Sequence, residues 1–133
     1  MKPFPNAIFL AALLASGVAA AADVVDERLA AYKARGAGGF SAAAGKALWN
    51  KSFPDPKGGE PQSCASCHTS NLSEPGKHVE TGKVIEPMKP AVNPKRLTDA
   101  KRIEKWFLRN CKRILGRECT AQEKGDFLVF VRN

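Results

Sequence analysis

Two cysteines separated by two residues, with a histidine directly after the second, constrain this chain more than any other feature. They are Cys64, Cys67 and His68, in the order Cys-Ala-Ser-Cys-His. Two thiols at this spacing can reach the two vinyl groups on one edge of a porphyrin, and the adjacent imidazole can bind its iron. A redox dithiol does not require the following histidine, and a zinc site would need a second nearby pair. The motif predicts one covalently bound haem c, with His68 as its permanent ligand and the other ring nitrogen donating to a carbonyl.

Sequence patterns typical of helices occur towards both ends of the chain and are absent from its middle. The patterns predict a helix over residues 23–35, a second helix capped by Ser41, a third from a cap at Thr98 through residue 115, and a last helix opened by a capping box at Thr120 and Glu123. Residues 54–97 are rich in Gly, Pro, Ser and Asn, which predicts a loop. A loop of this length is uncommon in a small domain unless something organises it. We therefore predict an all-α fold whose middle segment wraps the haem.

The first 22 residues have the pattern of a secretory signal peptide. Lys2 is followed by an apolar run over residues 7–20 and by three alanines that suit cleavage after residue 22. We predict an exported, periplasmic protein whose single domain, residues 23–133, is a monohaem cytochrome c. Removal of Lys2 with the leader would lower the net charge only from +8 to +7. Because an exported chain does not meet nucleic acid, this charge favours an acidic protein partner.

The ligand on the other side of the iron decides the function, because a strong permanent ligand favours electron transfer and a weak one permits gas binding. Met88 lies in a Pro-bounded loop, as a methionine ligand of an electron-carrying cytochrome c would. His78 is a weaker candidate, because its neighbours look solvent-exposed and the chain would have to turn around the porphyrin edge within ten residues.

A third candidate, Asn110, comes from helical spacing. It falls on one face of the third predicted helix, together with Ile103, Phe107 and Ile114. A buried amide without a partner costs roughly 1–3 kcal/mol, so an asparagine there needs a reason. The simpler explanation is a hydrogen bond to a backbone group or to a haem propionate. The alternative is that its oxygen faces the iron as a weak ligand that suits ferric better than ferrous iron.

The other two cysteines, Cys111 and Cys119, lie outside the haem motif. In an oxidising compartment the default for such a pair is a disulfide, which would join the last two helices and restrain the backbone at Asn110. The haem propionates need cations, for which the sequence offers four candidates: Lys83, Lys89, Lys95 and Arg96.

From residue 45 to the C-terminus the chain resembles the family of the sphaeroides haem protein (SHP) and the related cytochrome c''. The resemblance is carried by residues 81–90, 96–99, 105–111, 115–120 and 123–124. It implies a class I cytochrome c-like fold and a Cys111–Cys119 disulfide. In this family the residue before the first C-terminal cysteine is the sixth ligand, Asn in the SHP branch and His in the other, so the resemblance implies ligation by Asn110. Met88 departs from the family, in which an apolar residue such as Leu more often stands.

The resemblance also implies what the protein does. On reduction the asparagine leaves, and the ferrous haem binds oxygen, nitric oxide or carbon monoxide. The expected electron partners are a dihaem cytochrome c and a membrane cytochrome b, and we expect a monomer. Two alternatives remain open: a plain electron carrier that uses Met88, and a haem enzyme that reduces oxygen or consumes nitric oxide, although we locate no acid–base pair for such chemistry.

Overall fold

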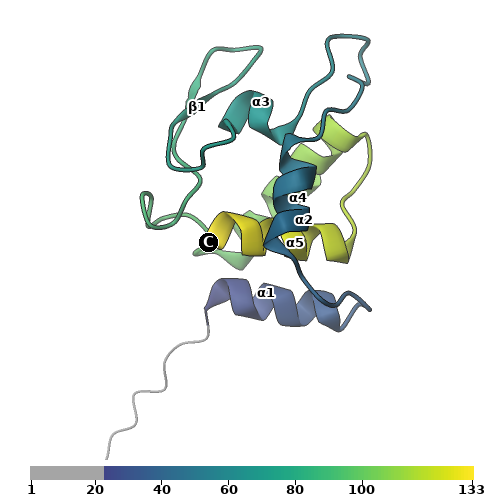
Figure 1. Ribbon diagram of the computed structural model, residues 1–133, viewed down its shortest axis with the longest axis vertical. Helices are drawn as coiled ribbons and strands as arrows, with labels where there is room; N and C mark the ends of the chain where they lie inside the picture. Colours follow the sequence, from purple (N-terminus) through teal and green to yellow (C-terminus); the bar gives the residue numbers. More distant parts are fainter. Residues whose placement is uncertain (1–22) are drawn as a thin grey trace, which may run out of the picture.

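The computed structural model describes residues 23–133, and the predicted signal peptide lies outside them (Figure 1). The described chain forms α1 (Val24–Lys33), α2 (Ala42–Asn50), α3 (Cys64–His68), β1 (Gly76–Lys77), β2 (Val84–Ile85), α4 (Ala100–Leu115) and α5 (Ala121–Arg132). The predicted all-α character is confirmed, since the only sheet in this part of the chain is one short antiparallel pair, β1 with β2. None of the helices described is long and apolar enough to cross a membrane.

Polar residues begin the helices, mostly where the sequence predicts. The Ser41 side chain accepts from the backbone at the start of α2, and Thr120 and Glu123 form the predicted capping box of α5. The prediction that Thr98 caps α4 is wrong by one residue. Asp99 is the cap, because its carboxylate lies 3.0 Å from the backbone nitrogen of Arg102, while the Thr98 hydroxyl donates to a carbonyl of the preceding loop.

The middle of the chain contains more regular structure than the predicted loop. Ser63 and Ser66 form a second capping box, which starts the five-residue helix α3. A hairpin follows, in which Gly76 of β1 pairs with Ile85 of β2. A helix of one turn and strands of two residues are too short to show a periodic hydrophobic pattern, which explains why the sequence does not predict them.

The core consists of two clusters joined through α4. The first, here called the motif-side cluster, contains Trp49, Leu72, Cys111, Cys119, Phe127 and Val131. The second contains Val25, Tyr32, Ile103 and Leu128, and it fixes α1 to α4 and α5. Phe107 and Leu97 pack against both clusters. Figure 1 shows α1 at the opposite end of the molecule from α3 and β1, so the haem motif lies away from the N-terminal helix.

The crossing of α2 and α5 depends on a glycine. A Cβ at Gly45 would collide with the backbone carbonyl of Asp126 and with the Phe130 side chain. The two helices therefore approach closely only because this position has no side chain. This contact places α2, and Trp49 at its end, beside the motif helix.

Candidate haem site

The two motif cysteines lie on one helical turn. The capping box at Ser63 begins α3 at Cys64, and residues three apart on a helix share a face. Cys67 is buried and Cys64 is half-buried, and neither takes part in a disulfide. Burial raises the pKa of the Cys64 thiol to about 11. The local fold thus presents two free thiols, side by side, to the apolar interior.

His68 ends the motif helix and packs against α2. Its ring centroid lies 5.4 Å from that of Trp49, whose indole nitrogen donates to the carbonyl of Thr69 at 2.9 Å. Burial, helped by the charge of Arg96, lowers the pKa of His68 to about 4. The imidazole is therefore neutral at pH 7, which is the form that binds a metal.

The predicted hydrogen bond from a ring nitrogen of His68 to a carbonyl is not present among the residues that the structure describes. His68 Nδ1 is buried and has no hydrogen-bond partner among residues 23–133. A buried imidazole nitrogen without a partner is costly for a purely structural histidine. It is consistent with a ring whose partner is a bound group.

The surroundings of the motif are apolar. Cys64 and Ala65 pack against the motif-side cluster, and so do Met88, Leu97 and Phe107 from the loop and from α4. Two thiols on one turn, a neutral imidazole next to them and an apolar wall fit the edge, the iron and the ring of a covalently attached haem. The donor set present therefore fits the group that the sequence predicts.

Asn110 lies on α4 between two residues of this wall. Phe107 packs against the motif-side cluster and Cys111 belongs to it, while Ile103 and Ile114 on the predicted shared face are buried. Asn110 itself is half-buried. Its side chain forms no hydrogen bond with any residue that the structure describes. Of the two simpler explanations offered by the sequence, the bond to a nearby backbone group is therefore not observed, and the bond to a haem propionate stays a prediction.

The two other candidate ligands have different surroundings. Met88 packs against the motif-side cluster, and its backbone nitrogen donates to the Leu72 carbonyl at 3.0 Å. His78 is engaged elsewhere, because its Nε2 lies 3.3 Å from an Arg113 nitrogen. Its Nδ1 accepts from two backbone N–H groups of its own loop. The structure thus brings Met88 towards the motif and holds His78 against the end of α4.

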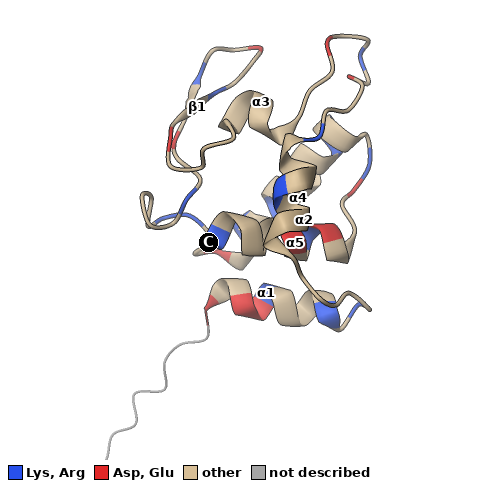
Figure 2. Cartoon of the chain, in the orientation of Figure 1, with Lys and Arg blue, Asp and Glu red and all other residues tan. Residues whose placement is uncertain are grey.

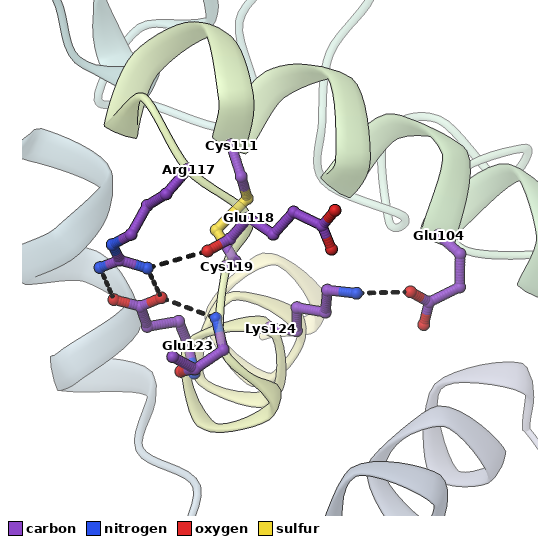
Figure 3. Close-up of a disulfide and its surroundings, with 8 residues drawn as sticks. Glu104, Cys111, Arg117, Glu118, Cys119, Glu123 and Lys124 are labelled. Carbon is purple, nitrogen blue, oxygen red and sulfur yellow. Dashed lines mark hydrogen bonds and ion pairs between the residues drawn. A yellow bond between two sulfur atoms is a disulfide. The ribbon is translucent and has the colours of Figure 1, made fainter.

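Cys111 and Cys119 form a disulfide that connects α4 to the start of α5, with their Cα atoms 5.6 Å apart (Figure 3). Figure 3 shows a second link across the same turn, in which the Arg117 guanidinium donates to both carboxylate oxygens of Glu123, at 2.8 and 2.7 Å. Hydrogen bonds from Arg117 lower the pKa of Glu123. Cys111 follows Asn110 directly, so the bridge restrains the backbone that carries the candidate ligand.

Of the four predicted propionate partners, one has a defined role within the protein. The Arg96 guanidinium donates to the carbonyls of Pro87 and Glu86, at 2.9 and 2.6 Å, and so holds the loop that carries Met88. The three lysines form no ion pair with the described residues. The sequence did not reveal this role of Arg96 or the contact of Trp49 with His68, because both depend on tertiary packing.

The fold and this site define a class, the monohaem c-type cytochromes, and the chain carries one covalently bound haem c. Within that class it belongs to the family of SHP and cytochrome c''. Residues 35–131 also match the family described as a domain of unknown function, DUF1924. The resemblance seen in the sequence is therefore confirmed.

Two relatives establish the family. The cytochrome c-type protein SHP of Cereibacter sphaeroides is 39% identical over 127 residues, which cover 93% of this chain and 95% of SHP. Cytochrome c'' of Methylophilus methylotrophus is 44% identical over 87 residues. That match covers 65% of this chain and only 60% of cytochrome c''.

Solved structures confirm the cytochrome c-like fold. The structure of oxidised SHP, described as an oxygen binding cytochrome c, is similar with a TM-score of 0.73 and 35% identity over 81% of this chain and 95% of that one. The crystal structure of oxidised cytochrome c'' is similar with a TM-score of 0.71 and 34% identity over 81% of this chain and 92% of that one.

Proposed function

We propose that this protein is a periplasmic cytochrome c, exported by a signal peptide at residues 1–22, that binds oxygen when its haem is reduced. Cys64 and Cys67 form the thioethers, His68 is the permanent ligand and Asn110 is a sixth ligand that leaves on reduction. The haem supplies the change of redox state and the affinity for diatomic gases. The observation that carries the proposal is the position of Asn110 beside the motif-side cluster, half-buried and with no hydrogen bond to the described residues.

The chemistry of the amide explains the redox dependence. The Asn110 side-chain oxygen is a hard, neutral and weak donor, which suits ferric iron better than the softer ferrous iron. In the reduced protein Asn110 would therefore hold the iron more weakly, and the haem would then supply the affinity for oxygen, nitric oxide or carbon monoxide. Two relatives support this proposal. SHP is described as an oxygen binding cytochrome c, and a solution structure of cytochrome c'' is described in terms of haem-ligand detachment.

The change of redox state requires electron exchange with other proteins. The proposed partners are a dihaem cytochrome c and a membrane cytochrome b, which would meet the basic chain through acidic surfaces. The formal net charge, +8 for the full sequence and +7 without Lys2, supports an acidic partner.

The experiment that tests the function is the absorption spectrum of the reduced protein with and without carbon monoxide. We expect a high-spin ferrous form that shifts on adding the gas, and a ferric spectrum that changes in Asn110→Ala but hardly in Met88→Leu. A reduced protein whose spectrum ignores carbon monoxide would contradict the open site.

A second candidate function has one observation in its favour. Met88 packs against the same cluster as Cys64, so a His68–Met88 pair in a plain electron carrier is the alternative. That carrier would be low-spin in both redox states, and Met88→Leu, not Asn110→Ala, would change its ferric spectrum.

A further inference from the structure

The exposed side of α4 concentrates unpaired positive charge. Six of its residues are Lys or Arg, and Figure 2 shows blue segments on α4. Arg113 pairs with Glu80 at 3.1 Å and Lys112 pairs with Glu118 at 3.4 Å. The other four form no ion pair with the residues that the structure describes, and together they are here called the α4 strip: Lys101, Arg102, Lys105 and Arg109.

No acidic side chain of α4 neutralises this strip. Glu104, the only acidic residue between Ala100 and Leu115, is turned towards α1 and α5. It accepts from the Tyr32 hydroxyl at 2.5 Å and from Lys124 at 2.8 Å. The strip therefore presents its charge to solvent, where it can attract an acidic surface.

Two large apolar side chains flank the strip. Trp106 is 45% exposed and Leu108 is 44% exposed. The Arg109 guanidinium lies over the Trp106 ring, 5.1 Å from its centroid. Tryptophan and arginine are enriched in the energetic centres of protein interfaces. An arginine already held against an aromatic ring loses less side-chain freedom when a partner binds.

We infer that the α4 strip, with Trp106 and Leu108 at its sides, is the docking surface for an acidic protein that exchanges electrons with the haem. This rests on the electron exchange of the proposed function. Trp106 precedes Asn110 by one helical turn, about 6 Å along the axis. A partner docked on the strip would therefore lie within about one helical turn of Asn110, the residue proposed to bind the iron.

The arrangement of Trp106 and Leu108 around the strip favours a protein partner over a membrane surface. Residues two apart on a helix face different directions, so Trp106 and Leu108 cannot both enter a flat bilayer. A partner with a shallow acidic groove can cover the strip and reach both side chains. Charge complementarity also speeds association by factors of about 10–1,000 at low ionic strength, which suits a transient electron donor.

The test uses reduced flavodoxin, an acidic redox protein, as the probe. Its flavin hydroquinone anion gives one electron to the ferric haem of the holoprotein and becomes the neutral semiquinone, and stopped-flow spectroscopy follows the haem. The variant Lys105→Glu/Arg109→Glu reverses two charges of the strip. The matched control, Lys33→Glu/Lys57→Glu, makes the same change of net charge on two lysines that form no ion pair with the described residues.

We expect the second-order rate to fall at least tenfold in the strip variant and less than threefold in the control, with the difference lost at high salt. Photoreduced lumiflavin, a small neutral reductant, should reduce wild type and both variants equally, which shows that the haem and fold are intact. Equal losses in both variants, or no loss in either, would overturn the proposal.

Two further measurements separate the alternatives. If the strip variant loses co-sedimentation with phosphatidylcholine–phosphatidylglycerol vesicles but keeps its flavodoxin rate, the surface is for membranes and the inference is wrong. The carbon monoxide spectrum reports the proposed gas binding independently. A wild type that ignores the gas but shows the expected rates would refute gas binding and leave the docking surface standing.

Discussion

Replacing both Cys111 and Cys119 by alanine should cost about 2.5 kcal/mol of unfolding free energy through the loss of the cross-link alone. The two cysteines are 8 residues apart in the sequence. Closing a loop of that length removes chain entropy worth about 2.5 kcal/mol from the unfolded state at 25 °C. For a domain of this size the loss corresponds to a melting temperature lower by about 10 °C. Both side chains are buried, with 4% and 7% of their surface exposed, so truncation adds a smaller packing cost.

The assay is urea unfolding at 25 °C, followed by far-ultraviolet circular dichroism. The covalent haem stays attached to wild type and variants in both the folded and unfolded states, so release of the cofactor does not enter the comparison. The single variants Cys111→Ala and Cys119→Ala provide the control, because either one already breaks the bridge. Each should lose most of what the double variant loses, and the two losses should not add.

Two results would refute this reasoning. A total loss below about 1 kcal/mol would mean that the bridge does not limit the unfolded chain as its short loop implies. Single losses that add up to the loss of the double variant would mean that the sulfurs contribute by packing and not by the link.

Two other predictions concern the core and the acid stability. Gly45→Ala should destabilise the fold by about 1–3 kcal/mol, because the new methyl group collides with the Asp126 carbonyl. The control Gly38→Ala, at a position where nothing lies within 4 Å, should change the stability little. Equal losses of stability in the two variants would contradict the close-packing argument. Burial raises the pKa of Glu104, but hydrogen bonds from Lys124 and Tyr32 outweigh this effect and lower it. Ionised Glu104 therefore stabilises the fold at pH values above its pKa in the unfolded chain, about 4.3. This stabilisation is lost as the pH falls through the lower pKa that Glu104 has in the folded protein. Melting curves should show Glu104→Gln less stable than wild type at pH 6, with the gap closing towards acid pH; a gap independent of pH would contradict this assignment.

The parts of the fold that local chemistry determines could be predicted from the sequence. Ser41 and Thr120 start helices because a hydroxyl in an extended residue reaches the free backbone N–H groups two or three positions on. Thr98 and Asp99 show where this approach fails. Both residues can cap a helix, and only the path of the preceding loop decides which one points its oxygen at the first turn.

The surroundings of the motif needed the folded structure. Trp49 touches His68 from 19 positions earlier in the chain, and Tyr32 reaches Glu104 across 72 positions. Neither contact has a local pattern, since each depends on how helices cross. The identity of the cofactor, by contrast, followed from five consecutive residues, because the geometry of thioether attachment permits little variation.

α4 carries both the proposed iron ligand, Asn110, and the proposed docking surface, and its position in the fold is fixed. Three links tie α4 to its neighbours: the disulfide from Cys111, the contact of Glu104 with Lys124, and the ion pair of Arg113 with Glu80. These links lie before, beside and after Asn110, so a rigid shift of the helix would strain all three. If Asn110 binds the iron as proposed, its departure would cost less by rotation of its own side chain than by a shift of the helix. Under this proposal the α4 strip would keep its shape in both redox states, so a partner that delivers an electron would meet the same surface before and after the ligand leaves.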